Sequence, residues 1–364
     1  MIKFHNLDRR YAEVKNTYHY FLDKIISSDK VFDGPYVSEV EHWLQKYSNR
    51  KHALLVTSGT QALSLSLLAA GIGPGDGVII TGYSCMASLT PVTMLGADPI
   101  LCEIDECGQM DITSVDIPKH AKALIATGLY GDVHNHDLIE SFCKKHNLNY
   151  INDAAQSYFS KYKHRDSVEL GDIVCLSFAE NKPLPCFGTH GAILTNNTRL
   201  YADLLYMRKH GKPYRTSAWT SKGINAHPHE NVAAQILTST MFYLKWQDRR
   251  KQINDYYDSE FKDIVPIRPM SLHTSSNYHK YSIMVPDKFK FFKILYAEGV
   301  DSECHYPDAF CNLPWIVSDF HPMCDMYAKK SLTIPSNPHM TDSEVEVVVT
   351  KVKKCFQLLN PTDS

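Results

Sequence analysis

Short β-rich runs alternate with amphipathic helical segments through most of this 364-residue chain. The strand-sized runs lie at residues 53–56, 78–81, 99–103, 123–126, 150–152, 173–178 and 192–195. Apolar residues at helical spacing separate many of these runs, as at 61–70 and 138–146. Strand and helix in alternation predict an α/β fold, with a mostly parallel central sheet that is flanked by helices.

Longer helical patterns lie toward both ends of the chain. Residues 8–28 show helical spacing, and a long helical stretch covers about 230–261. The last hundred residues carry a further strand at 281–285 and helices at 288–298 and 342–358. From this change of pattern we expect a large domain at residues 1–250 and a smaller C-terminal α+β domain at residues 251–364.

Composition argues against several kinds of partner. The chain is 44% hydrophobic, which is in the ordinary range for a globular protein. Its formal net charge is −2, so it has no excess of positive charge that would attract nucleic acid or an anionic membrane. No apolar run approaches the roughly 20 residues of a membrane span, and residues 1–10 lack the apolar core of a signal peptide. The ten cysteines show no C-x-x-C spacing, so we expect reduced thiols, no metal site and a cytoplasmic location.

A turn of small residues, Thr57-Ser58-Gly59-Thr60, joins the first strand to the helix that follows it. Unpaired N–H groups and a partial positive charge at a helix N-terminus suit a phosphate group. Gly59 would let the backbone approach that phosphate closely, and Thr60 would add a hydroxyl. The turn taken alone, however, favours a simple helix cap.

An acid and a lysine follow two later strands. Asp153 comes after the strand at 150–152, at the end of the strand where open α/β sheets bind ligands. A carboxylate there can pair with a protonated ring nitrogen, or it can be a solvated strand end. Lys182 follows the strand at 173–178, and a lysine in a desolvated site can lose its proton and attack a carbonyl. Taken alone, a surface lysine is the simpler interpretation.

The order of these three segments is typical of fold-type I pyridoxal-phosphate enzymes. More narrowly, the chain resembles the DegT/DnrJ/EryC1/StrS family of nucleotide-sugar aminotransferases. The motifs that carry the resemblance are Met1-Ile2-Lys3-Phe4-His5-Asn6-Leu7, Ser58-Gly59-Thr60 with Ala62-Leu63, Gly73-Pro74-Gly75-Asp76, Asp153-Ala154-Ala155-Gln156, Ser177-Phe178 with Lys182, Gly191-Ala192-Ile193-Leu194-Thr195-Asn196, Arg208 with His210-Gly211, Gly223-Ile224-Asn225 and Leu332-Thr333-Ile334-Pro335. Each motif is weak by itself, but their shared order is specific.

The resemblance implies the cofactor pyridoxal 5′-phosphate, held as a Schiff base on Lys182. This lysine would also move a proton between the substrate carbon and the cofactor carbon. Asp153 would keep the ring nitrogen protonated, so that the ring withdraws electrons. The other implied cofactor contacts are Gly59, Thr60 and Ser177 at the phosphate, Gln156 at the phenolic oxygen, and Asn225 from a neighbouring subunit. That last contact implies a homodimer with shared active sites.

The implied reaction transfers an amino group from an amino acid, L-glutamate by the habit of the family, to a nucleotide-linked keto-deoxysugar. Its product would be an amino-deoxysugar nucleotide for a polysaccharide, a glycan or a glycosylated metabolite. Two alternatives stay open. A pyridoxal-phosphate-dependent keto-deoxysugar dehydratase is expected to replace Lys182 with histidine, although His190 lies nearby in the chain. A non-catalytic, cofactor-binding regulatory protein is suggested by the altered loop at 183–190.

The chain departs from the family pattern around the expected cofactor. Cys85 stands where the family has an aromatic residue that stacks on the ring, so Tyr83 is the expected alternative for stacking. A threonine and His190 replace an acid and a glycine after the lysine. We expect His190, His305 and Tyr306 to contact the substrate. The sequence specifies neither the nucleotide nor which sugar carbon, 3 or 4, is aminated.

Overall fold

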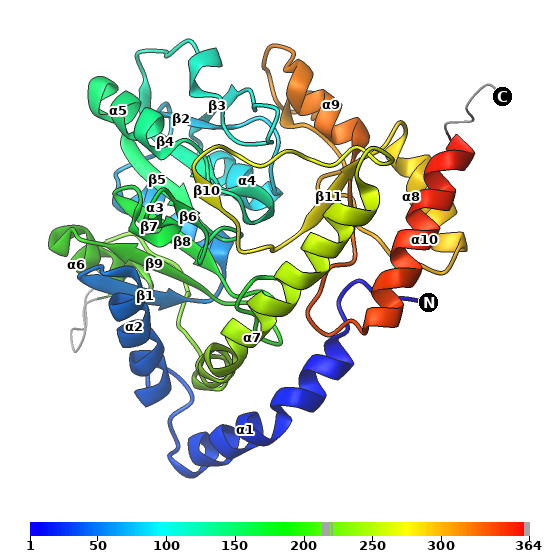
Figure 1. Cartoon of the computed structure of the whole chain (residues 1–364). Coiled ribbons are helices and arrows are strands. Elements are labelled where there is room, and N and C mark those ends of the chain that lie inside the picture. The colour runs from blue at the N-terminus through cyan, green and yellow to red at the C-terminus, as the bar shows by residue number, and fades with distance from the viewer. Residues whose placement is uncertain (213–218, 220, 360–364) are drawn as a thin grey trace.

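The computed structural model describes residues 1–212, 219 and 221–359. A seven-stranded sheet lies at its centre, with the strand order β1-β9-β8-β5-β4-β2-β3 (Figure 1). Its strands are β1 (His52–Val56), β2 (Gly77–Thr81), β3 (Asp98–Cys102), β4 (Ala121–Thr127), β5 (Asn149–Asp153), β8 (Ile173–Ser177) and β9 (Gly191–Thr195). Neighbours from β3 to β8 pair in parallel, whereas β9 is antiparallel to both β8 and β1. The predicted α/β fold with a mostly parallel sheet is confirmed.

The helices are α1 (Leu7–Ser27), α2 (Pro35–Ser48), α3 (Gly59–Ala69), α4 (Met86–Met94), α5 (His136–His146), α6 (Thr198–Met207), α7 (Glu230–Phe261), α8 (Lys288–Ala297), α9 (Pro322–Lys330) and α10 (Asp342–Leu359). Helices α2 to α6 and the first half of α7 cover both faces of the large sheet, whereas α8 and α10 pack in the C-terminal part of the chain. The four helices expected at 8–28, 230–261, 288–298 and 342–358 are present with bounds that agree to within one residue. In the described part of the chain, no helix combines the length and the apolar character that crossing a bilayer requires.

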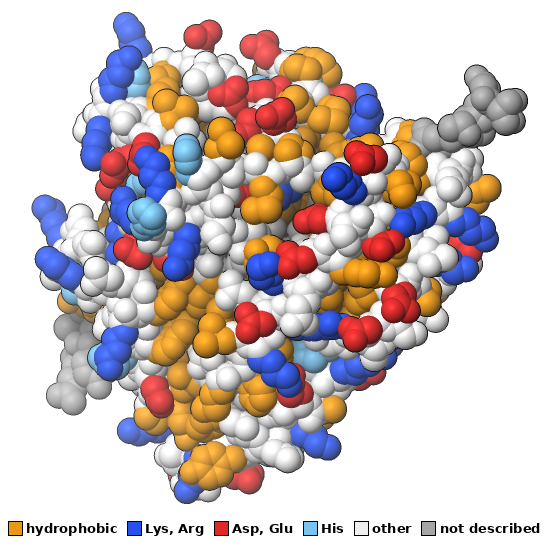
Figure 2. Space-filling model, in the orientation of Figure 1, with side chains coloured by type: hydrophobic (Ala, Val, Ile, Leu, Met, Phe, Trp, Pro, Cys, Tyr) orange, Lys and Arg blue, Asp and Glu red, His pale blue; other side chains and the backbone are white. Residues whose placement is uncertain are grey.

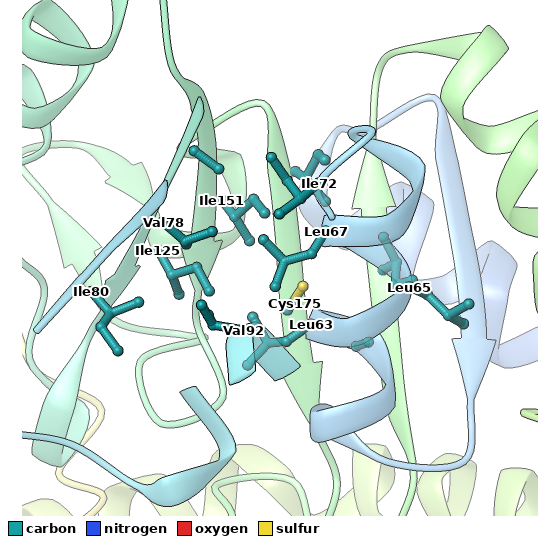
Figure 3. Packing of buried hydrophobic residues seen from close by; sticks show 14 of the residues in the cluster. Leu63, Leu65, Leu67, Ile72, Val78, Ile80, Val92, Ile125, Ile151 and Cys175 are labelled. Atoms are coloured by element: carbon teal, nitrogen blue, oxygen red, sulfur yellow. The ribbon is translucent and has the colours of Figure 1, made fainter. Parts of the chain in front are cut away.

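Alternate residues of each strand face opposite layers, as the two-residue period of a strand requires. In β1, Leu54 packs in the cluster that contains α3 and α4, whereas Leu55 packs in the cluster that contains α2 and α7. Figure 3 shows the first of these layers, where Leu63 and Leu67 of α3 point toward the strands. Because both faces are covered, β2, β8 and β9 consist entirely of buried residues, whereas the edge strand β3 is buried only at its end.

A separate apolar cluster lies in the C-terminal part of the chain. It joins the second half of α7 to α8, α10 and the antiparallel pair β11 (Tyr281–Met284) and β12 (Ser331–Ile334). Helix α7 runs unbroken through residue 250, so it belongs to both parts. The division at that residue stays a prediction.

The sequence pattern did not reveal the small sheet of β10 (Thr274–Ser275), β6 (Lys161–Tyr162) and β7 (Arg165–Asp166), whose strands are too short to show a period.

The start of α7 closes the N-terminus of α2. The N-cap of α2 is Gly34, which has no side chain to accept hydrogen bonds from the first turn. The buried carboxylate of Glu230 takes that role. It accepts hydrogen bonds from the backbone N–H groups of Gly34 at 2.9 Å, Val37 at 2.8 Å and Tyr36 at 3.0 Å. The first residue of α7 is thereby fixed against the helix that covers β1.

Candidate active site

The N-terminus of α3 lies against the end of β8. Ser58 caps the helix, since its hydroxyl oxygen accepts a hydrogen bond from the N–H of Gln61 at 3.1 Å. A Cβ placed on Gly59 would lie 2.8 Å from the Cβ of Ser177, so the close approach requires glycine. Gly59, Thr60 and the Ser177 hydroxyl therefore gather at one helix start, with the geometry of an anion-binding turn. The helix cap that the turn suggested is present, and it is Ser58, one residue before Gly59.

Asp153 is the last residue of β5 and is 5% exposed. One carboxylate oxygen accepts hydrogen bonds from the hydroxyls of Ser88 at 3.2 Å and Thr127 at 3.4 Å, and the other accepts from the N–H of Ala155 at 3.1 Å. Burial raises the pKa of this carboxyl, while the Ala155 N–H and the charge of Lys182 act in the opposite direction. Among the described residues, no cationic side chain lies within 4 Å of it, so a protonated ring nitrogen would complete its surroundings.

Lys182 lies in the turn after β8, half-buried, with its N–H donating to the carbonyl of Ala179 at 2.9 Å. Its charge acts on the pKa of Asp153, which places both side chains in one region at neighbouring strand ends. In the described part of the chain, its Nζ has neither a hydrogen bond nor an ion pair with the protein. This nitrogen is therefore available to react.

Tyr306 links the expected substrate and cofactor contacts. Its hydroxyl accepts a hydrogen bond from the side-chain amide of Gln156 at 2.7 Å, and the Gln156 carbonyl oxygen accepts from the N–H of Tyr130 at 3.1 Å. Burial raises the pKa of Tyr306, with smaller contributions that begin with Cys85. Gln156, Tyr306 and Cys85 thus lie together, while the contact of Gln156 with the cofactor stays a prediction.

Tyr83 is fully buried beneath this group. Its hydroxyl donates to the carbonyl of His305 at 2.5 Å and accepts from the N–H of Tyr306. The side chain therefore supports the backbone at 305–306. Cys85 is the N-cap of α4 and is partly exposed. Whether either residue contacts the ring of a cofactor stays a prediction.

The two expected substrate histidines have different surroundings. The Nε2 of His305 lies 2.9 Å from Lys280 Nζ and 3.0 Å from a Glu303 oxygen, and burial lowers its pKa to about 4. His190 is 2% exposed, and its Nε2 accepts a hydrogen bond from the N–H of His229 at 3.0 Å. Burial lowers the pKa of His190 to about 4 as well, so it is neutral and ties β9 to the start of α7. Its contact with substrate stays a prediction.

Asn225 is exposed and lies in an isolated antiparallel bridge with Lys209. Its expected contact belongs to a second subunit and stays a prediction.

The sequence did not reveal three cations that line a cavity beside Lys182, namely Arg10, Arg250 and Lys280. They come from α1, from α7 and from the residue before β11. No motif could have marked them, because only the tertiary fold brings these segments together.

Known proteins show the same architecture along the whole chain. Residues 13–353 match the DegT/DnrJ/EryC1/StrS aminotransferase family. The chain is 28% identical to the UDP-2-acetamido-2-deoxy-3-oxo-D-glucuronate aminotransferase of Pseudomonas aeruginosa over 96% of this chain and 98% of that protein. It is 27% identical to the pleiotropic regulatory protein of Geobacillus stearothermophilus, over 97% of this chain and 98% of that one.

A solved structure agrees with these matches. The S. venezuelae protein DesV, solved in complex with a ketimine intermediate, superposes with a TM-score of 0.92 at 26% identity, over 97% of this chain and 98% of that one. The predicted fold type I and the predicted family are thereby confirmed. Because the family match covers residues 13–353, nearly the whole chain, the chain belongs to the DegT/DnrJ/EryC1/StrS aminotransferase family.

Proposed function

We propose that this protein transfers an amino group from L-glutamate to a nucleotide-linked keto-deoxysugar, with pyridoxal 5′-phosphate bound to Lys182. The observation that carries the proposal is the convergence of three groups at one edge of the sheet. These groups are the α3 N-terminus with Ser177, the buried carboxylate of Asp153, and the Nζ of Lys182. In this proposal they would hold the phosphate, pair with the ring nitrogen and bond to the aldehyde carbon of the cofactor, in that order. The bound cofactor would supply a conjugated ring that withdraws electrons from the reacting carbon.

The protein groups have separate tasks in this proposal. The N–H groups at the start of α3 and the Ser177 hydroxyl hold the phosphate. Burial raises the pKa of Asp153, so its charged form is costly without a cationic partner. A protonated ring nitrogen would be that partner and would keep the carboxylate charged. Lys182 Nζ would take a proton from the substrate carbon and deliver it to the cofactor carbon, and the reverse in the second half of the reaction. Tyr306 and Gln156 border this space through their hydrogen bond.

Sugar nucleotides as amino acceptors are supported by the name of the Pseudomonas aeruginosa relative, an aminotransferase of a 3-oxo sugar nucleotide. L-Glutamate as donor rests on the family resemblance. A homodimer with shared active sites is supported by the exposure of Asn225, whose side chain is accessible to a second subunit.

A regulatory role is the second candidate. The observation that favours it is the match to the pleiotropic regulatory protein of Geobacillus stearothermophilus. In that case the protein would bind the cofactor without turnover. A dehydratase role is disfavoured by Lys182, because the lysine needed for transamination is present.

The test is to incubate the purified protein and cofactor with L-glutamate and a panel of keto-sugar nucleotides, and to measure 2-oxoglutarate. We expect 2-oxoglutarate to form with wild type and with the surface control Lys329→Ala, but not with Lys182→Ala. Ammonia released without 2-oxoglutarate would favour the dehydratase. Cofactor binding without any turnover across the panel would refute the transaminase and favour the regulatory role.

A further inference from the structure

A small cavity of about 60 Å³ adjoins Lys182, on the side where α1, α7 and the residues before β11 meet. Since one ordered water needs roughly 15 Å³ of such space, the cavity has room for about four water-sized groups. Its wall contains four cationic side chains, those of Arg10, Lys182, Arg250 and Lys280. Of the described lining residues, Glu180 alone carries a carboxylate.

None of these four cations has a direct ion pair in the described part of the chain, although Glu303 attracts Lys280 through His305, which lies between them. No carboxylate of the described residues lies within 4 Å of any of them. Their neighbours in the chain behave differently. Arg9 pairs with Glu344 at 2.6 Å, and Arg249 pairs with Asp342 at 2.6 Å, both toward the surface. Figure 2 shows cationic and acidic side chains side by side on the outside of the molecule. The pairing that is usual at this surface is missing inside the cavity.

Neutral acceptors hold the inward-facing cations in place. Arg10 donates to the carbonyl of Glu180 at 2.6 Å, and Arg250 donates to the carbonyl of Pro183 at 3.4 Å. The Nε of Arg250 has no hydrogen-bond partner although the residue is only 5% exposed, and the Nε2 of His279 in the same wall has none either. Carbonyl groups fix a guanidinium but do not neutralise it. A buried charge such as that of Arg250, without a neighbouring carboxylate, is costly, so an arriving anion gains more here than at the surface.

We propose that this cavity binds a carboxylate group of a substrate, with Lys280 and Arg250 as its cationic partners. The volume admits a carboxylate but not a nucleoside diphosphate. The proposal rests on the proposed function, because the carboxylate must lie within a few bonds of the carbon that Lys182 deprotonates. Two substrates have such a group, namely the amino-acid donor and a keto-sugar that is itself a uronic acid.

The test measures binding of unreactive probes to the cofactor-loaded protein by calorimetry, without turnover, at pH 6, where Lys280 with its pKa of about 7 is protonated. Two matched pairs separate the sources of the carboxylate, glutarate against glutaramide and UDP-glucuronate against UDP-glucose. Charge-assisted hydrogen bonds predict that wild type binds the acid of at least one pair about tenfold or more tightly than its neutral counterpart. Preference within the first pair assigns the donor, and preference within the second assigns a sugar acid.

Lys280→Met should remove the preference for the acid and leave the affinity for the neutral probe unchanged. Arg250→Gln should weaken the same preference, whereas the control Arg249→Gln should retain it, because Arg249 faces Asp342. Melting curves of every variant exclude misfolding. The proposal is overturned if wild type discriminates within neither pair, or if a folded Lys280→Met keeps the full preference. Transaminase activity without any discrimination would refute the cavity proposal alone.

Discussion

Replacement of Lys280 by methionine, which has a similar length and no charge, should stabilise the protein. Lys280 is 7% exposed, and burial lowers its pKa from the ordinary 10.5 to about 7, against the attraction of Glu303. That difference corresponds to about 5 kcal/mol of unfavourable free energy for the charged form. The substitution also removes the hydrogen bond between Lys280 and His305, which lowers the free energy of unfolding by about 1 kcal/mol and offsets part of this gain. We therefore expect Lys280→Met to raise the free energy of unfolding by about 4 kcal/mol at pH 6.

The pH dependence of this gain has a definite sign. Between pH 7 and 10.5 the unfolded lysine holds its proton while the folded one does not, so the stability of wild type rises with pH across that window. The advantage of Lys280→Met should therefore shrink by nearly 3 kcal/mol from pH 6 to pH 9. Urea unfolding of both proteins at pH 6, 7, 8 and 9 measures it. A variant less stable than wild type at pH 6, or a gain that does not change with pH, would refute the reasoning.

Three further substitutions test other parts of the molecule. Gly59→Ala forces its Cβ against Ser177, so we expect cofactor affinity, followed by fluorescence titration, to fall about tenfold or more with little loss of helix stability. Glu230→Ala leaves three N–H groups of α2 without their acceptor and should lower the free energy of unfolding by about 3 kcal/mol, whereas Glu39→Ala on the exposed side of α2 should change it by less than about 0.5 kcal/mol; equal effects would contradict the cap. Asp153→Asn should still bind cofactor but slow 2-oxoglutarate formation by about a hundredfold, and unchanged turnover would exclude a role for its charge.

The strands and the catalytic candidates were predictable because they depend on local pattern. Most strands of the large sheet are short runs of mainly apolar residues, and the parallel neighbours β5 and β8 end at the same edge. Asp153 ends β5 and Lys182 follows the end of β8, so their proximity follows from the order of the strands. The turn at Gly59 was readable for the same reason, since a strand, a small-residue turn and a helix succeed one another directly.

The surroundings of these residues were not predictable, because they depend on tertiary packing. Tyr83 looks like a candidate for stacking in the sequence, yet its hydroxyl is committed to the backbone at 305–306. Nothing in the sequence distinguishes Arg250 from Arg249, although one lines the cavity and the other pairs with Asp342 at the surface. Which of two adjacent arginines faces inward is decided by how α7 packs against the loop after β8.

The covalent site of the cofactor can be located directly. The protein is loaded with pyridoxal 5′-phosphate, reduced with sodium borohydride and digested, and the modified lysine is identified by mass spectrometry. We expect the pyridoxyl group on Lys182 in wild type and no label at that peptide in Lys182→Ala. A label on Lys280, the other lysine of the cavity wall, or no stable label at all, would contradict the assignment of Lys182 as the catalytic lysine.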